Sequence, residues 1–291
     1  MLHTLQAAGG VMAHGLDVLF YGDIPNGAGL SSSASIEMLT AVLAQHIYQL
    51  SFTQLDLVKL AQRSENEFNG LNCGIMDMFA SGMGQAEHAM LLNTHTLAHQ
   101  HVPVDLGDTY SLLIANTNKR RDLSESNYNQ RRFECDAALL DLKRVFPVET
   151  LCDLTPEFLT QHQHAIENPV HLKRARHAIT ENARTLQAVK ALQNHDLQQF
   201  GQLMNASHVS LREDFEVTGE HLDAMVEAAW AHGAIGARMT GAGFGGCTVM
   251  LVKQTELTEF CTKVAAQYTA QTGLTPSFYP VNIDDGARLL E

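Results

Sequence analysis

The sequence predicts an α+β fold in two domains, and two features of the chain lead to this expectation. Long stretches repeat their apolar residues at helical spacing, and short apolar strands lie beside turns that pair them antiparallel. A doubly wound sheet would instead alternate strand and helix along the whole chain. We place the domain boundary before the apolar strand at 110–116, which gives an N-terminal domain of residues 1–107 and a C-terminal domain of residues 108–291.

The expected N-terminal domain opens at Met1–His3 within a helix, and continues with a strand and two longer helices. Leu16, Val18 and Phe20 alternate along the strand, in residues 11–24. Thr53 is the expected N-cap of the second helix, and Gly70 its end. The further elements, in order, are helices at 33–49 and 53–69, a loop and short helix at 71–84, and strands at 88–94 and 98–104.

Helices dominate the expected C-terminal domain. Pro147, Pro156 and Pro169 mark breaks between them. The expected elements are a strand at 110–116, helices at 124–146, 170–193, 196–211 and 219–232, strands at 235–240 and 247–252, a helix at 256–272 and a strand at 277–283.

The charge of the chain argues against two classes of partner. Its 19 basic and 32 acidic side chains give a net charge of −13, which repels nucleic acid and anionic membranes. The five cysteines form no Cys-x-x-Cys unit, as expected of thiols in a reducing cytosol. No apolar run reaches the roughly 18 residues of a membrane span. We therefore expect a cytoplasmic protein that binds neither nucleic acid nor a membrane.

Residues 24–35, which read IPNGAGLSSSAS, predict a phosphate site. Gly27 and Gly29 let the backbone turn tightly and approach a ligand, and helical spacing begins at Ala34. A glycine loop that leads into a helix presents unpaired N–H groups and the positive end of the helix dipole to a phosphate. The alternative is a surface turn before a capped helix.

Further motifs connect this loop to a known family. The loop, NCGIMD at 72–77 after a helix at 60–66, and RMTGAGFGGC at 238–247 occur in this order. They resemble the motifs of the small-molecule kinases named for galactokinase, homoserine kinase, mevalonate kinase and phosphomevalonate kinase. Residues 127–135 and 207–218 narrow the resemblance to the galactokinases. The resemblance covers nearly the whole chain.

The resemblance implies the two-domain fold of these kinases, with the active site in the interdomain cleft. It also implies ATP-dependent phosphorylation of D-galactose to α-D-galactose 1-phosphate. Mg²⁺ is the implied cofactor, held by the hydroxyl of Ser33 and the carboxylate of Glu65. A helix cap at Ser33 and a solvated charge at Glu65 are the alternatives. The implied ATP-binding residues are Gly27, Ala28, Gly29, Leu30, Ser31, Ser32 and Ser33.

Asp77 is a single carboxylate in an apolar stretch, which is typical of a helix cap or a functional group. The resemblance makes it the catalytic base that accepts the proton of the anomeric hydroxyl. It also makes Gly74, through its backbone N–H, and Tyr128, through its phenol, residues that bind the sugar. An exposed helical tyrosine is the alternative for Tyr128.

Two further groups of residues allow more than one interpretation. The glycine run 241–246 lacks the lysine of a P-loop, and is by itself equally a close-packed turn after a strand. The resemblance implies that it closes over the phosphate loop. His95, His99 and His101 lie close together, but we expect surface or core histidines rather than a metal site.

One departure from the family concerns the start of the chain. The galactokinases that it resembles begin with a segment carrying a Gly-Glu-His-Thr-Asp-Tyr-like signature, which this sequence lacks. We therefore expect an incomplete N-terminal domain and impaired activity of this chain. The alternatives are a kinase for a related sugar such as N-acetylgalactosamine, or a non-catalytic sugar- or nucleotide-binding regulator. The expected small-molecule partners are galactose and ATP, and the expected state is a monomer.

Overall fold

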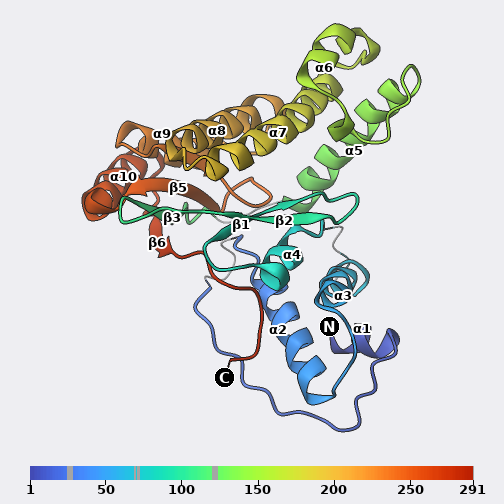
Figure 1. Ribbon diagram of the computed structural model, residues 1–291. Helices are drawn as coiled ribbons and strands as arrows, with labels where there is room; N and C mark the ends of the chain where they lie inside the picture. The colour runs from blue at the N-terminus through green and yellow to red at the C-terminus, as the bar shows by residue number, and fades with distance from the viewer. Residues whose placement is uncertain (25–28, 69, 71–72, 120–123, 291) are drawn as a thin grey trace. The chain divides into compact units, whose positions relative to one another are not determined.

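A computed structural model describes residues 1–24, 29–68, 70, 73–119 and 124–290. The chain forms two compact units (Figure 1). The first contains Leu30–Val104, the N-terminal residues through Ile24 and the C-terminal segment from Asn282; the second contains Asp105–Val281 and Gly29. Both units combine helices with antiparallel strand pairs, as the α+β expectation requires. The domain limits at 107 and 108 stay a prediction.

The first unit packs four helices around an apolar core. Leu5, Met38, Leu57 and Phe79, one from each of these helices, are almost completely buried in it. The third helix of the unit starts at a capping box, in which Thr53 Oγ1 accepts from the Asp56 N–H at 3.1 Å and the Asp56 carboxylate accepts from the Thr53 N–H at 2.9 Å. The elements are α1 (Leu2–Ala7), α2 (Ser32–Ile47), α3 (Gln54–Glu67), α4 (Met76–Met83), β1 (His88–Leu92) and β2 (His99–Pro103).

The C-terminal segment belongs to this first unit. The N–H of Glu87 donates to the carbonyl of Ile283 at 3.1 Å, and the N–H of Gly286 donates to the carbonyl of Gly84 at 2.9 Å. A Cβ on Gly286 would lie only 2.8 Å from the backbone of Gly82, so the close approach of these two chain segments requires a glycine. The C-terminal segment therefore packs against the end of α4 and the residues that follow it.

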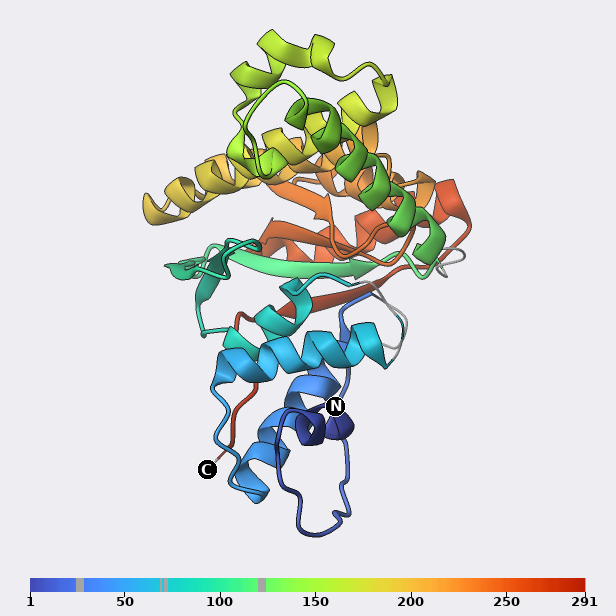
Figure 2. The ribbon, with the colours of Figure 1, turned by 90° about the vertical axis from the view of Figure 1, so that its right-hand side faces the viewer.

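Residues 11–24 form an irregular segment, not the expected strand. Figures 1 and 2 show it as the long blue loop that connects α1 with α2. Leu19 and Tyr21 are 94% and 96% exposed. Alternating side chains favour an extended backbone, but a strand also needs a neighbour that takes up its hydrogen bonds, and the alternation does not supply one.

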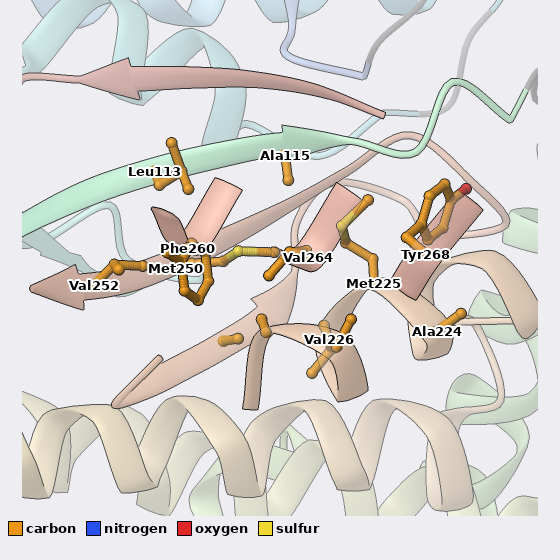
Figure 3. Packing of buried hydrophobic residues seen from close by; sticks show 13 residues of the cluster. Leu113, Ala115, Ala224, Met225, Val226, Met250, Val252, Phe260, Val264 and Tyr268 are labelled. Atoms are coloured by element: carbon orange, nitrogen blue, oxygen red, sulfur yellow. The ribbon is translucent and has the colours of Figure 1, made fainter. Parts of the chain in front are cut away.

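The second unit is built on an antiparallel sheet with the strand order β4-β5-β3-β6. Figure 3 shows its core, where Leu113 and Met250 of the sheet pack with Phe260 and Val264 of one helix and Met225 of another. The strands are β3 (Tyr110–Asn116), β4 (Gly236–Met239), β5 (Cys247–Lys253) and β6 (Ser277–Val281), and the two helices of the core are α9 (Glu220–Ala231) and α10 (Leu257–Thr272).

The remaining helices of this unit lie between β3 and α9 in the sequence. The helix that contains Gly201 approaches the start of β4 closely, because a Cβ on Gly201 would lie 2.4 Å from the carbonyl oxygen of Ile235. The helices are α5 (Ser124–Lys143), α6 (Pro156–His162), α7 (Pro169–Gln193) and α8 (Leu197–Ser210), which one π-helical turn, Leu211–Phe215, follows. Single turns of 3₁₀ helix lie at Leu151–Asp153, Gln163–Ala165 and Gln254–Glu256.

Two findings bear on the environment of the chain. None of the helices in the described ranges is both long and apolar enough to cross a membrane. The five cysteines, all of which the structure describes, form no disulfide.

Candidate active site

The expected phosphate loop leads into α2. Gly27 and Ala28 lie outside the described residues. Gly29 has a φ angle of 73°, in the left-handed region that favours glycine, and Leu30 beside it is half-buried. The chain therefore turns sharply immediately before the helix, as a loop that surrounds an anion does.

Three serines begin α2. Ser31 is the N-cap residue, with a left-handed φ of 56° and no side-chain cap hydrogen bond. Ser32 is half-buried, and Ser33, in the first turn, is exposed. The cap position considered for Ser33 thus belongs to Ser31. Ser33 therefore lies at the N-terminus of α2, the end of a helix that attracts anions, and it is accessible to solvent.

Glu65 lies near the end of α3 on its buried face. Its exposed fraction is 3%, and its neighbours on this face, Ala61 and Ser64, are equally buried. The alternative of a solvated helix charge is therefore wrong. A buried carboxylate is stable only where hydrogen bonds or a cation compensate the loss of hydration. The role of Glu65 as a metal ligand stays a prediction.

Asp77 is the second residue of α4, in a half-buried position. Ile75 occupies the N-cap, so Asp77 is not the cap of this helix. The side chains of Met78 and Phe79 that follow are buried in the core of the unit.

The loop before α4 is held by α3. Asn66 Oδ1 accepts from the backbone N–H of Cys73 at 3.1 Å and from its thiol at 3.2 Å, and Gln62 Nε2 donates to the carbonyl of Cys73 at 3.2 Å. Gly74, the next residue, is exposed, and a Cβ built on it would meet no atom within 4 Å. A ligand therefore has room beside the backbone of Gly74.

Carboxylates on three helices act electrostatically on Cys73. Burial raises the pKa of its thiol, and the negative charges of Glu65, Asp77 and Glu37 raise it further. Glu37, on α2, was not among the residues expected from the sequence. A signal for it exists, because it follows Ser33 by four residues and interrupts the buried face formed by Ala34, Met38 and Ala41.

The chemistry of these side chains fits a divalent cation bound with phosphate. The charges that shift the pKa of Cys73 are those of carboxylates, whereas the pKa of Glu37 is raised by burial and by Glu65 and lowered by the positive N-terminus. Within the described ranges, no three His, Cys, Asp or Glu side chains form a dedicated metal cage. Mg²⁺ does not need one, since it takes one or two carboxylates and completes its shell with waters and substrate phosphates.

The glycine run 241–246 forms a left-handed turn within the second unit. The φ angles of Gly241, Gly243, Phe244, Gly245 and Gly246 are all positive. The N–H of Phe244 donates to the carbonyl of Val217 at 2.7 Å, and Thr117 Oγ1 donates to the carbonyl of Gly246 at 2.7 Å. A Cβ on Gly243 would clash with Val217, so the run is a close-packed turn; its closure over the phosphate loop stays a prediction.

Two other expectations concern Tyr128 and the histidines. The backbone of Tyr128 lies in α5, and its side chain lies outside the described part of the structure. The phenol of Tyr128 as a sugar ligand therefore stays a prediction.

His99 and His101 lie on β2, where His101 Nε2 contacts the carbonyl oxygen of Met83 at 2.7 Å.

The chain matches two family models. Residues 1–85 match the model of the GHMP kinases N terminal domain, and residues 188–270 match that of the GHMP kinases C terminal.

Individual proteins are similar over almost the whole chain. A galactokinase of Clostridium beijerinckii is 50% identical over 289 residues, which cover 99% of this chain and 74% of that protein. The crystal structure of Lactococcus lactis galactokinase complexed with galactose superposes with a TM-score of 0.92 at 41% identity, covering 99% of this chain and 74% of the other. L. major mevalonate kinase, with a TM-score of 0.57 and 19% identity over 89% of this chain and 67% of that one, shares the fold. The chain thus spans about three quarters of the galactokinases it matches.

Proposed function

The chain belongs to the galactokinases of the GHMP kinase family, and from this premise we propose that it transfers the γ-phosphoryl group of ATP to galactose, forming α-D-galactose 1-phosphate. The observation that carries the proposal is the hydrogen bonding of the loop before α4. Asn66, which directly follows Glu65 on α3, accepts hydrogen bonds from Cys73, and Asp77 follows four residues later in the first turn of α4. A kinase of this kind needs both a metal-binding carboxylate and a carboxylate near the nucleophile.

The start of α2 is the proposed site for the phosphates of ATP. Backbone N–H groups of residues 27–33 would contact the phosphate oxygens, supported by the positive end of the helix dipole. Ser33 and Glu65 would hold Mg²⁺, for which a hydroxyl and a carboxylate are suitable oxygen ligands. When bound, the ion neutralises charge on the phosphates and helps to orient them for in-line attack.

Asp77 is the proposed base. Its carboxylate would accept a hydrogen bond, and then the proton, from the anomeric hydroxyl as that oxygen attacks the γ-phosphorus. A carboxylate in the first turn of α4 is a weak base, so most of its effect would come from orienting the hydroxyl. The backbone N–H of Gly74 and the phenol of Tyr128 would hold other oxygens of the sugar.

The proposal is tested by supplying the chain with Mg·ATP and single sugars. We expect ADP release that depends on galactose, and a sugar 1-phosphate signal in the ³¹P NMR spectrum of the products. Faster ADP release with N-acetylgalactosamine would assign the site to that sugar. Binding of ATP and galactose without any sugar-dependent ADP release would contradict a kinase and favour a regulator.

We also propose that the protein acts as a cytoplasmic monomer. The absence of disulfides among its five cysteines supports a reducing compartment. Light scattering of the purified chain tests the monomer, and a mass of twice 31.9 kDa would contradict it.

A further inference from the structure

Three segments that are far apart in the sequence meet at one turn of the second unit. The turn is the π-helical turn Leu211–Phe215 with Glu216 and Val217 after it, and we call residues 211–217 the π segment. The other two are the part of α5 around Arg131 and the glycine run 241–246. π-helical turns are rare and are frequent at functional sites, and the proposed reaction gives this one no role.

Arg131 of α5 binds the backbone of the π segment. Its Nε donates to the carbonyl of Phe215 at 2.7 Å, and its Nη2 donates to the carbonyl of Glu216 at 3.1 Å. Glu216 has a left-handed φ angle of 58°, so these two carbonyls lie where the chain leaves the helical conformation. A planar guanidinium offers its donors in a fixed geometry, which suits two acceptors that must keep their relative position.

The third nitrogen of the guanidinium is also engaged. Nη1 of Arg131 lies 3.2 Å from Oε2 of Glu134, one turn further along α5, and the side chain of Arg131 is only 15% exposed. All three nitrogens therefore have partners within the second unit. This arrangement favours a role in positioning over direct contact with a substrate.

The π segment in turn binds the glycine run. The carbonyl of Val217, which is 4% exposed, accepts from the Phe244 N–H at 2.7 Å. A Cβ on Gly243 would clash with the same carbonyl oxygen, so the two backbones are in close contact. A continuous series of hydrogen bonds and peptide units therefore leads from Arg131 through the carbonyls of residues 215–217 to Phe244.

We propose that Arg131 is a positioning residue of the reaction, which holds α5 and the glycine run in one arrangement through the π segment. The inference rests on the proposed function, in which Tyr128, one turn before Arg131 on α5, binds the sugar. The predicted task of the glycine run is to close over the phosphate loop. One side chain then serves the binding of both substrates, and a misplacement of about 1 Å can lower a rate about a hundredfold.

The kinetic test is Arg131→Lys, which keeps a positive charge beside Glu134 but cannot donate to two carbonyls in the geometry of a guanidinium. We expect kcat/KM to fall about tenfold or more for galactose and for ATP alike. The matched control is Arg132→Lys, the next residue of α5, whose ion pair with Asp136 is exposed. This control is expected to have the kinetic constants of the unmodified chain.

Thermal unfolding shows whether the variant remains folded at the assay temperature. We expect that it does, because Glu134 keeps its hydrogen bond with Arg174 Nε at 2.6 Å in Arg131→Lys. A loss of kcat/KM in a folded variant is an effect on positioning, whereas a merely structural arginine would change the melting temperature without changing the kinetics of the folded fraction.

Amide hydrogen exchange gives a readout that needs neither ATP nor sugar. In Arg131→Lys we expect faster exchange in peptides that cover residues 241–246, because the Phe244 N–H loses part of its protection when the π segment moves more freely. Peptides of β3 and β5 should exchange as in the unmodified chain, because a local loosening leaves the core of the sheet intact.

Three outcomes would overturn the proposal. They are unchanged kinetics in Arg131→Lys, a loss of kcat/KM for only one of the two substrates, or unchanged exchange in residues 241–246. If Arg131→Lys does not fold, Arg131→Gln keeps a donor for one carbonyl, and the same changes are then expected; their absence overturns the proposal. Absence of kinase activity in the unmodified chain, together with the expected exchange result, would contradict only the proposed function.

Discussion

Asn66 Oδ1 accepts two hydrogen bonds from Cys73, one from its backbone N–H at 3.1 Å and one from its thiol at 3.2 Å. Asn66 follows Glu65 directly on α3, and Cys73 precedes Gly74. The side chain of Asn66 therefore connects the part of α3 that carries Glu65, the proposed metal ligand, to the loop that carries Gly74, the proposed sugar-binding residue. Positioning of this kind affects the rate without any contact to the substrate.

We expect Asn66→Ala to lower kcat/KM for galactose about tenfold, because a loosened loop misplaces Gly74. The two lost hydrogen bonds should also reduce the free energy of unfolding by about 1–2 kcal/mol. Steady-state kinetics and urea unfolding measure the two effects. Arg63→Ala, which breaks only an exposed ion pair on the same helix, is the control.

The thiol bond is tested separately from the backbone bond. Cys73→Ser keeps a donor for Asn66 Oδ1, whereas Cys73→Ala does not. We expect the serine variant to retain more of the galactose kcat/KM than the alanine variant. Equal kinetics for these two variants and for Asn66→Ala would mean that Asn66 does not position the loop.

Asp77→Asn should lower turnover at least about a hundredfold, because an amide cannot accept the proton of the sugar hydroxyl. ATP affinity should remain close to that of the unmodified chain, since Asp77 is proposed to meet the sugar. A coupled ADP assay and a nucleotide titration measure these properties. Asp17→Asn, at an exposed aspartate, is the control. Near-normal turnover of Asp77→Asn would contradict its assignment as the base.

Glu65→Gln should raise the Mg²⁺ concentration required for half-maximal turnover about tenfold, because a charged oxygen ligand becomes neutral. Turnover measured over a series of Mg²⁺ concentrations at fixed ATP shows the shift. The control is Glu67→Gln, on the same helix but exposed. The same Mg²⁺ dependence in both variants would assign Glu65 a role in packing only.

The sequence predicted those elements whose signals are local. Thr53 is the N-cap of α3, and Pro169 opens α7, because caps and prolines act on the backbone beside them. Helix α6 was not expected, although Thr155 caps it and Pro156 is its first residue. That signal was present in the chain but was interpreted only as a break.

Features that depend on distant parts of the chain were not predictable in this way. The irregular segment 11–24 alternates like a strand, and no local pattern reveals whether a neighbour pairs with it. The return of Ile283 and Gly286 to the first unit is likewise a long-range contact. Glu37 and Glu65 are both charged helical residues in the sequence, and only the packing of α2 on α3 shows that both are buried.

The second unit contains a buried ion pair between α5 and α7. Arg174 is 2% exposed, and its Nε donates to Glu134 at 2.6 Å. Burial raises the pKa of Glu134, but Arg174, with Arg131 and Gln130, outweighs it, so the pKa lies below its usual value. Glu134→Leu should therefore cost about 3 kcal/mol or more, since it leaves the buried guanidinium of Arg174 with Glu216 but without Glu134.

The double variant Glu134→Leu/Arg174→Met separates pairing from packing. It removes both charges of the pair but also takes these partners from Arg131 and Glu216, so we expect it to recover part of the stability that Glu134→Leu loses. Urea unfolding of the unmodified chain, the single variants and the double variant gives the coupling free energy. Strictly additive losses would show that the two side chains stabilise the fold independently.

His177, also in the second unit, makes the stability of this unit sensitive to acid. Burial lowers the pKa of its ring to about 4; the charge of Glu181 raises it, and those of Arg184 and Arg238 lower it further. Its Nδ1 lies 3.0 Å from Ser210 Oγ, and because that hydroxyl donates to Asp214, the ring N–H is the donor to Ser210. The folded chain therefore holds His177 neutral, whereas the unfolded chain protonates it near its ordinary pKa of about 6.5.

The folded pKa lies below the unfolded one, so the unfolded state takes up the proton first as the pH falls. Stability is therefore unaffected above about pH 6.5 and is lost progressively towards pH 4, with a loss of about 2 kcal/mol by about pH 5. His177→Asn keeps a donor for Ser210 and does not titrate. We expect urea unfolding to show a smaller loss between about pH 7.5 and about pH 5 in this variant, by about 2 kcal/mol. Carboxylates that titrate in the same range act on both proteins alike, so the difference between the two curves isolates His177. Parallel curves would mean that its ring is protonated equally easily in the folded and unfolded states.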